Sequence, residues 1–125
     1  MTFKTPPLGK VEGAAAEELA CRYLSARGLQ LVSRNFSCRF GEIDLVMRDR
    51  GDLVFVEVRY RRNACFGSAA ASIDWRKQNK LIHTANYYLQ TKCPKGVPPC
   101  RFDVVAVSDN IDSPAIEWLR NAIAL

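Results

Sequence analysis

Three acidic residues occur where the sequence otherwise predicts two apolar strands. In "GEIDLVMRDRGDLVFVEVRYRR", residues 41–62, Glu42, Asp44 and Glu57 interrupt runs of Leu, Ile, Val and Phe. Acidic side chains are uncommon in strands, and they are costly to bury without a partner. Because carboxylate oxygens are the ligands that Mg²⁺ prefers, the stretch suggests a metal site formed by these acids.

The predicted register of the hairpin brings the acids together. A short turn at Arg50 and Gly51 places Asp44 opposite Glu57. The same register places Glu42 opposite Arg59, and because side chains alternate along a strand, all four residues are expected on one face. The other face is expected to hold four apolar side chains: Ile43, Leu45, Val56 and Val58.

The repulsion between two facing carboxylates must be offset by another group. Directly facing side chains have Cβ atoms about 4.5–5.5 Å apart, and like charges repel at that distance. A divalent cation would compensate, and it could also activate water and neutralise charge that develops on phosphorus. The alternative is that the acids point to solvent, with Glu42 and Arg59 in an exposed ion pair worth under about 1 kcal/mol. The apolar neighbours Leu53 and Phe55 on the same face, and Glu17 at the boundary of a helical stripe, favour the metal site.

The elements that must position these residues follow in the order helix, three strands, helix, two strands. We expect helices at 12–27 and 73–90, and strands at 29–36, 41–47, 52–60, 101–107 and 115–119. Residues 1–12 are expected to form a flexible arm, and residues 61–72 and 92–100 to form loops. This order predicts a single α/β domain, residues 1–125, with a mixed central sheet flanked by helices.

Apolar stripes at helical spacing predict which face of each helix packs on the sheet. The first stripe comprises Ala16, Leu19, Ala20, Tyr23 and Leu24, and Gly28 is a helix stop just beyond it. The second stripe comprises Leu81, Ile82, Ala85, Tyr88 and Leu89.

Composition narrows the class of protein. The chain of 125 residues is 48% hydrophobic and 25% charged, as is ordinary for one globular domain. It has no apolar run of membrane-spanning length and no apolar segment of signal-peptide type at its start, so we expect a cytoplasmic protein. Five cysteines without a CxxC pair, and the single His83, favour reduced thiols over a zinc site. The net charge of +5 mildly favours a polyanionic partner.

The pattern E-x-D…E-V-x-x-R on consecutive strands, after a helical glutamate, resembles the PD-(D/E)xK nuclease superfamily, which has the restriction-endonuclease-like fold. The chain is more similar still to the bacterial YraN-like family, whose acid arrangement is similar to that of archaeal Holliday-junction resolvases. The segments that carry this resemblance span nearly the whole chain: "GAAAEELACRYL" (13–24), "RNFSCRFGEIDLV" (34–46), "VFVEVRYR" (54–61), "FGSA" (66–69), "KQNKL…ANYYL" (77–89) and "RFDVVAV" (101–107).

The resemblance implies that Asp44 and Glu57 bind Mg²⁺ or Mn²⁺ and that Glu17 supplements them. It also implies a catalytic lysine two residues after Glu57, where this chain has Arg59. An arginine stays protonated and cannot act as a general base, although it can bind phosphate and stabilise a transition state.

Two residues of the second predicted helix are candidates for the catalytic role of the absent lysine. Lys77 lies on the flank of the apolar stripe and could replace the family's lysine; the alternative is a surface lysine with a buried stem. Gln78 lies near the middle of the stripe, and it could either reach a phosphate or metal-bound water, or be a hydrogen-bonded core amide.

Basic residues in the same region could bind a nucleic-acid backbone, which gives affinity and little sequence information. They are Arg59, Arg61, Arg62, Arg76, Lys77 and Lys80. We expect His83 at the surface, and Trp75 and Phe66 in the core rather than stacked on bases. These observations favour a metal-dependent DNA endonuclease, with branched or damaged DNA as a candidate substrate. A nucleic-acid-binding module with a degenerate site and a protein-interaction domain stay open, as does the homodimer that the resolvase resemblance implies.

Overall fold

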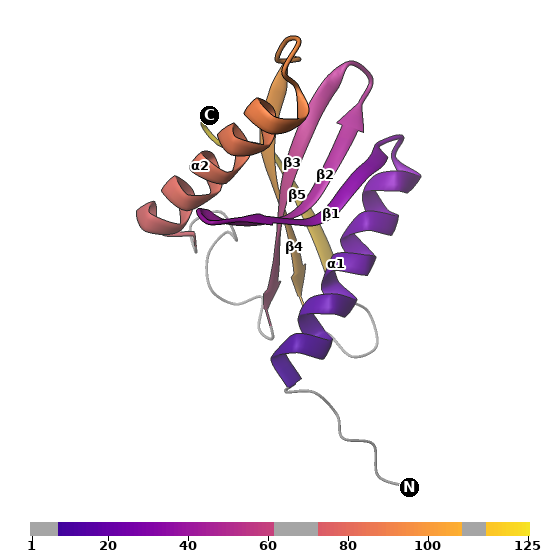
Figure 1. Ribbon diagram of the computed structural model, residues 1–125. Helices are drawn as coiled ribbons and strands as arrows, with labels where there is room; N and C mark the ends of the chain where they lie inside the picture. Colours follow the sequence, from indigo (N-terminus) through magenta and orange to yellow (C-terminus); the bar gives the residue numbers. More distant parts are fainter. Residues whose placement is uncertain (1–7, 62–72, 109–114) are drawn as a thin grey trace, which may run out of the picture.

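The computed structural model describes residues 8–61, 73–108 and 115–125, and of residues 8–12 and 61 it describes the backbone alone. The helices are α1 (Leu8–Ala26) and α2 (Trp75–Lys92). The strands are β1 (Gln30–Cys38), β2 (Gly41–Asp49), β3 (Asp52–Arg61), β4 (Cys100–Ser108) and β5 (Ala115–Ile123). Figure 1 shows these elements in the predicted order, helix, three strands, helix, two strands.

The five strands form one sheet in the order β1-β2-β3-β4-β5. Neighbouring strands are antiparallel except for β3 and β4, which are parallel and are connected through α2. A parallel pair needs such a crossover, whereas antiparallel neighbours can be joined by short turns. The prediction of a mixed sheet flanked by helices is therefore confirmed.

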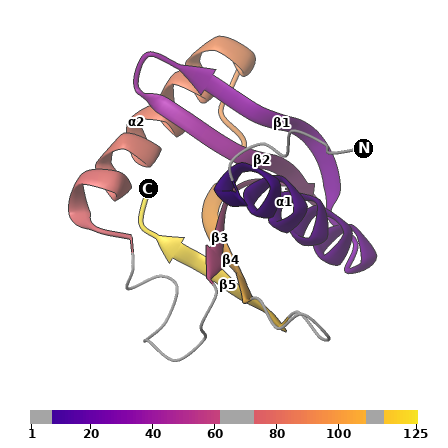
Figure 2. The same ribbon diagram turned by 90° about the horizontal axis from the view of Figure 1, so that it is seen from below.

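The two helices cover opposite faces of the sheet (Figures 1 and 2), and each encloses its own core. The α1 core contains Ala16, Ala20 and Leu24 of the predicted stripe, packed with Leu45, Val54, Val56 and Val105. The α2 core contains Leu81, Ala85, Tyr88 and Leu89, packed with Phe55, Phe102 and Val104. Because β3 and β4 are buried on both faces, their sequences are continuous apolar runs.

Several element boundaries differ from the prediction. Helix α1 begins at Leu8, so residues 8–12 are helical and were wrongly assigned to the flexible arm. A glycine and prolines near this point suggested a loop, but proline is tolerated at the start of a helix and a single helical glycine costs only about 1 kcal/mol. Strand β5 continues to Ile123, four residues beyond the predicted end. Helix α2 begins after Asp74, whose carboxylate accepts a hydrogen bond from the Lys77 amide at 2.8 Å.

The predicted register between β2 and β3 is confirmed near the turn and fails farther along. Asp49 pairs with Asp52 and Leu45 pairs with Val56, but the ladder stops there. The ladder therefore contains neither the expected pair of Asp44 with Glu57 nor that of Glu42 with Arg59, and Glu42 is instead paired with Ser37 of β1.

An irregularity at Asn35 and Asp44 explains why the ladder stops. The β1–β2 pairs on either side are Arg34 with Leu45 and Phe36 with Ile43, whereas Asn35, between them, has a left-handed φ of 51°. Side-chain alternation breaks at the same point, because Ile43 packs in the α2 core and Leu45 in the α1 core. The prediction that Ile43 and Leu45 share a face is wrong for this reason, and Asp44 lies where β2 changes from one face to the other.

Candidate functional site

The Asp44 carboxylate is held by the backbone of the neighbouring strand. The Val58 amide of β3 donates a hydrogen bond to Asp44 Oδ2 at 2.8 Å. This bond lies just beyond Leu45 and Val56, the last pair of the β2–β3 ladder, so a side chain occupies the place of a strand carbonyl. Asp44 is half-buried there, and hydrogen bonds link it to two further acids, Glu17 and Glu57.

Glu57 is almost entirely buried, with 3% of its surface exposed, although it lies in the middle of an apolar strand. Burial, hydrogen bonding with Asp44 and the negative charge of Asp44 together raise the pKa of Glu57 to about 8, against the positive charges of Lys77 and Arg59, which lower it. The carboxyl group therefore carries its proton through much of the neutral range in the absence of another cation.

Glu17 approaches Asp44 from α1, on the opposite side of the sheet from α2. Partial burial raises the pKa of Glu17 to about 7, as do hydrogen bonding with Asp44 and repulsion from Asp44 and Glu42, against the opposing charge of Arg34. The three carboxyl groups of Glu17, Asp44 and Glu57 form what we call the carboxyl cluster. Helix α1 contributes Glu17 and strands β2 and β3 contribute Asp44 and Glu57, and Asp44 lies where β2 changes from one face of the sheet to the other.

Lys77 borders the carboxyl cluster on the α2 side. Its Nζ lies 3.5 Å from Glu57 Oε2, and its side chain is 43% exposed. The Asp74 carboxylate accepts a hydrogen bond from the Lys77 amide, and this N-cap fixes the first turn of α2, which holds Lys77 beside Glu57. Arg59 follows Glu57 by two residues on the same strand, and its charge acts on the same carboxyl group.

The oxygen-rich donor set suits a hard divalent cation such as Mg²⁺ or Mn²⁺. Glu17 and Glu57 have raised pKa values because each is desolvated and is repelled by the charge of Asp44, and a cation would relieve both effects. Across the part of the chain that the structure describes, no three Asp, Glu, His or Cys side chains are already arranged as ligands of one ion. Binding would therefore require the shared protons to leave and the carboxyl groups to turn.

The other predicted site residues are Gln78, Glu42, Arg76, Lys80, Arg61 and Arg62. The Gln78 side-chain amide donates to the Ile73 carbonyl at 2.9 Å, the arrangement expected of a hydrogen-bonded core amide. Glu42 is exposed, as are Arg76 and Lys80 on α2. The Arg61 side chain and all of Arg62 lie outside the described residues.

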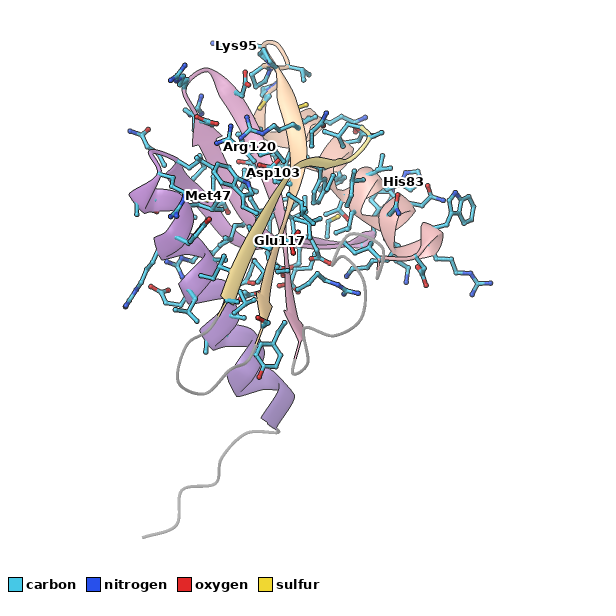
Figure 3. The ribbon with its side chains drawn as sticks, turned by 180° about the vertical axis from the view of Figure 1, so that it is seen from behind. Met47, His83, Lys95, Asp103, Glu117 and Arg120 are labelled. Carbon is cyan, nitrogen blue, oxygen red and sulfur yellow. The ribbon has the colours of Figure 1, made fainter. Side chains whose placement is uncertain are left out.

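The prediction for Trp75 is wrong, and the prediction for His83 is confirmed. Trp75 was expected in the core, but it is 75% exposed because it occupies the first position of α2, at the edge of the packed layer. Phe66 lies outside the described residues. His83 is at the surface as predicted, on the outer side of α2 (Figure 3), with its ring stacked on Phe40 at 5.7 Å between centroids.

A second buried acid escaped the sequence analysis. Asp103 in β4 is completely buried and accepts hydrogen bonds from Arg101 Nε at 3.1 Å, Trp118 Nε1 at 2.9 Å and the Asn121 amide at 2.8 Å. The signal that identified Asp44 and Glu57, an acid within an apolar strand, was present here too, in "RFDVVAV".

The structure describes four of the five cysteines and both helices. Cys21, Cys38, Cys93 and Cys100 are free thiols, and Cys65 lies outside the described residues. Within the described ranges, neither α1 nor α2 combines the length and the apolar character that crossing a membrane requires.

Comparisons with known proteins identify relatives along most of the chain. A model of the family described as "Uncharacterised protein family UPF0102" matches residues 16–107. A UPF0102 protein of Nitrosococcus oceani is 51% identical over 117 residues, which cover 94% of each chain. A UPF0102 protein of Ralstonia nicotianae is 52% identical over 125 residues, covering 97% of this chain and 92% of that one.

A solved structure is similar at a much lower level. It is the structure of Pyrococcus furiosus SfsA in complex with Ca²⁺, with 11% sequence identity and a TM-score of 0.39. The match covers 90% of this chain and 63% of the other. This likeness is too distant to bear on the site.

Proposed function

The chain belongs to the uncharacterised protein family UPF0102, the YraN-like family that its sequence resembles, and we propose that it is a metal-dependent endonuclease that hydrolyses DNA phosphodiesters. The proposal includes membership of the PD-(D/E)xK superfamily. Branched or damaged DNA is the substrate class that the resolvase resemblance favours.

The observation that carries the proposal is the carboxyl cluster. Glu17 and Glu57 both contact Asp44, and both have raised pKa values, about 7 and about 8. Strongly perturbed acids that are close together and supplied by different elements occur more often at functional sites than elsewhere. A purely structural role would have been met at lower cost by apolar residues in these positions.

In this proposal Asp44 and Glu57 hold a Mg²⁺ or Mn²⁺ ion, with Glu17 as a supplementary ligand directly or through water. When bound, such an ion lowers the pKa of a coordinated water and neutralises charge that develops on phosphorus. The Val58 amide keeps the Asp44 carboxylate oriented, through its bond to Oδ2. The buried position of Glu57 limits solvent around its carboxyl group.

Lys77 takes the place of the family's strand lysine. Its Nζ, 3.5 Å from Glu57, is a compact donor close enough to orient water or stabilise negative charge on a phosphate oxygen. Arg59 binds the phosphate and does not act as a base, since a guanidinium stays protonated. Exposed Arg76 and Lys80 contribute charge attraction to the nucleic-acid backbone.

A nucleic-acid-binding module with a degenerate site is the second candidate, and one feature favours it. Arg59 stands at the lysine position, and Lys77 reaches Glu57 from a helix, where its side chain is still 43% exposed. A module of this kind would bind nucleic acid without a metal, and its affinity would fall steeply as salt rises.

Cleavage of defined DNAs separates the two. Purified protein is incubated with linear, flapped and four-way DNAs, with Mg²⁺ or Mn²⁺ and with a chelator, beside Asp44→Asn. The endonuclease is expected to cleave at least one of these substrates only with metal, and Asp44→Asn is expected to be inactive. Salt-sensitive binding of all substrates without cleavage under either metal would instead identify the binding module.

A further inference from the structure

A cavity lies at the end of the sheet where β2 turns into β3, away from the carboxyl cluster. It has a volume of about 530 Å³ and is lined by Arg27, Gly28, Asp49, Arg50, Asp52 and Arg120. Asp49 follows Asp44 by five residues along β2, which is about 17 Å at a strand rise of about 3.3 Å per residue. Three of the lining residues are arginines, supplied by the chain after α1, the β2–β3 turn and β5.

Two of these arginines are held against aromatic rings. Arg27 Cζ lies 3.5 Å from the centroid of the Tyr23 ring, and Arg120 Cζ lies 4.0 Å from that of Trp118. The two rings meet edge to face, with centroids 6.5 Å apart. A guanidinium that lies on a ring has its orientation restricted before any ligand arrives, and the N–H groups at its edge can still donate. Arg27 uses one of them, because its Nη1 donates to the Tyr23 carbonyl at 3.2 Å, which leaves its other N–H groups for a ligand.

Buried Asp103 fixes the position of Trp118, one ring of this aromatic pair. Its Oδ2 accepts the Trp118 Nε1 proton at 2.9 Å, and its Oδ1 accepts the Asn121 amide at 2.8 Å, on either side of Arg120 in the chain. Figure 3 shows Arg120 close to Asp103 across the β4–β5 pair. Such prior ordering reduces the conformational entropy that binding would otherwise cost.

The two acids of the cavity, Asp49 and Asp52, share one arginine, Arg101, which also pairs with buried Asp103 at 3.1 Å. Arg101 Nη2 lies 2.9 Å from Asp49 Oδ2, and Arg101 Nη1 lies 3.7 Å from Asp52 Oδ2. Among the residues with described side chains, Arg27, Arg50 and Arg120 form no ion pair with a carboxylate. The cavity therefore presents three arginines whose positive charge has no partner within that part of the chain.

We propose that this cavity binds a phosphate group through Arg27, Arg50 and Arg120. Arginine matches phosphate oxygens with paired N–H donors, and three guanidiniums from separate elements can surround one such group. The phosphate comes from a nucleic-acid backbone or from a small phosphate compound. For a backbone, about 17 Å corresponds to roughly five nucleotide steps of about 3.4 Å between this cavity and the carboxyl cluster. The inference does not depend on hydrolysis at that cluster.

Binding is measured without divalent metal at low salt, by calorimetry with inorganic pyrophosphate and by fluorescence anisotropy with a labelled DNA duplex. The test variant is Arg27→Gln/Arg120→Gln. The matched control is Arg48→Gln, which removes one positive charge from an exposed position of β2 near Tyr88, on the α2 face. We expect the double variant to bind at least about tenfold more weakly and the control to stay within about twofold of the unchanged protein.

The two ligands separate the sources of the phosphate. Weakened binding of both means that the cavity accepts phosphate from either source, and weakened binding of the duplex alone assigns the nucleic-acid backbone. Equal affinities of the double variant and the unchanged protein for both ligands would overturn the proposal, whatever the result of the cleavage assay. If the double variant unfolds, Arg50→Gln at the exposed turn replaces it, with the same expected direction.

Discussion

Lys77 Nζ lies 3.5 Å from Glu57 Oε2, although the two residues belong to α2 and β3 and are far apart in the chain. The contact places Lys77 beside the most buried acid of the carboxyl cluster. In the proposed nuclease site, this contact would compensate for Arg59 at the position where the PD-(D/E)xK pattern has lysine.

Replacing Lys77 is expected to affect the site and leave the fold intact. Lys77→Met should reduce metal-dependent cleavage by about 10²-fold, the usual loss when one donor to a transition state is removed. It should also raise the pKa of Glu57 further, because the lysine charge lowers it. Carboxyl ¹³C NMR titration measures this shift. Lys92→Met, exposed at the last position of the same helix, is the control; equal cleavage by both variants would contradict the role of Lys77.

The metal-free protein is expected to lose stability as pH rises from about 5 to about 8. The folded-state pKa values of Glu17 and Glu57, about 7 and about 8, lie above the ordinary value of 4.5. In this window the folded protein binds more protons than the unfolded chain, so the free energy of unfolding falls with pH. Urea unfolding at a series of pH values measures the slope.

Substitution of single acids tests the origin of that slope. Glu57→Gln should flatten it, because the amide cannot titrate. Glu18→Gln on the same helix as Glu17 should leave it unchanged: hydrogen bonds from Arg34 and Arg22 lower the pKa of Glu18, so this group titrates below the window. A slope that persists in the Glu17→Gln/Glu57→Gln double variant would show that other groups cause it.

Divalent metal is expected to stabilise the protein more strongly at pH 8 than at pH 6. An ion at the carboxyl cluster competes with the protons of Glu17 and Glu57, which are released as pH rises. At a metal concentration one hundred times the dissociation constant, the free energy of unfolding should increase by about 2.7 kcal/mol. Thermal melts with Mg²⁺ or Mn²⁺ measure the effect. Asp44→Asn should abolish it, whereas exposed Glu117→Gln should not; similar stabilisation of both variants would exclude the cluster as the binding site.

Replacement of Asp103 is expected to lower the free energy of unfolding more than replacement of an exposed acid. Asp103→Ala leaves Arg101 and the Trp118 indole without their buried acceptor, which should cost about 3–5 kcal/mol of unfolding free energy. Asp52→Asn is the control, because its 47% exposed carboxylate lies 3.7 Å from the same arginine and should contribute under about 1 kcal/mol. Equal losses in urea unfolding would show that Asp103 has no special role.

The sequence alone determined the order of the elements, the mixed sheet and the two helix faces. These features follow from local regularities: helical spacing in Ala16, Ala20 and Leu24, apolar runs in β3 and β4, and a short turn at Arg50. The contact between Asp44 and Glu57 was also foreseeable, because the turn sets the register of the adjoining strands and that register holds as far as Leu45.

The tertiary structure decided the rest. The left-handed Asn35, the end of the ladder at Leu45 and the change of face between Ile43 and Leu45 arise where three strands and α1 meet, and none of them has a periodic signature. The contact of Lys77 with Glu57 and the convergence of Arg27 and Arg120 join residues far apart in the chain. Spacing along a chain reports neighbours within one element, whereas the approach of separate elements depends on how all the side chains pack together.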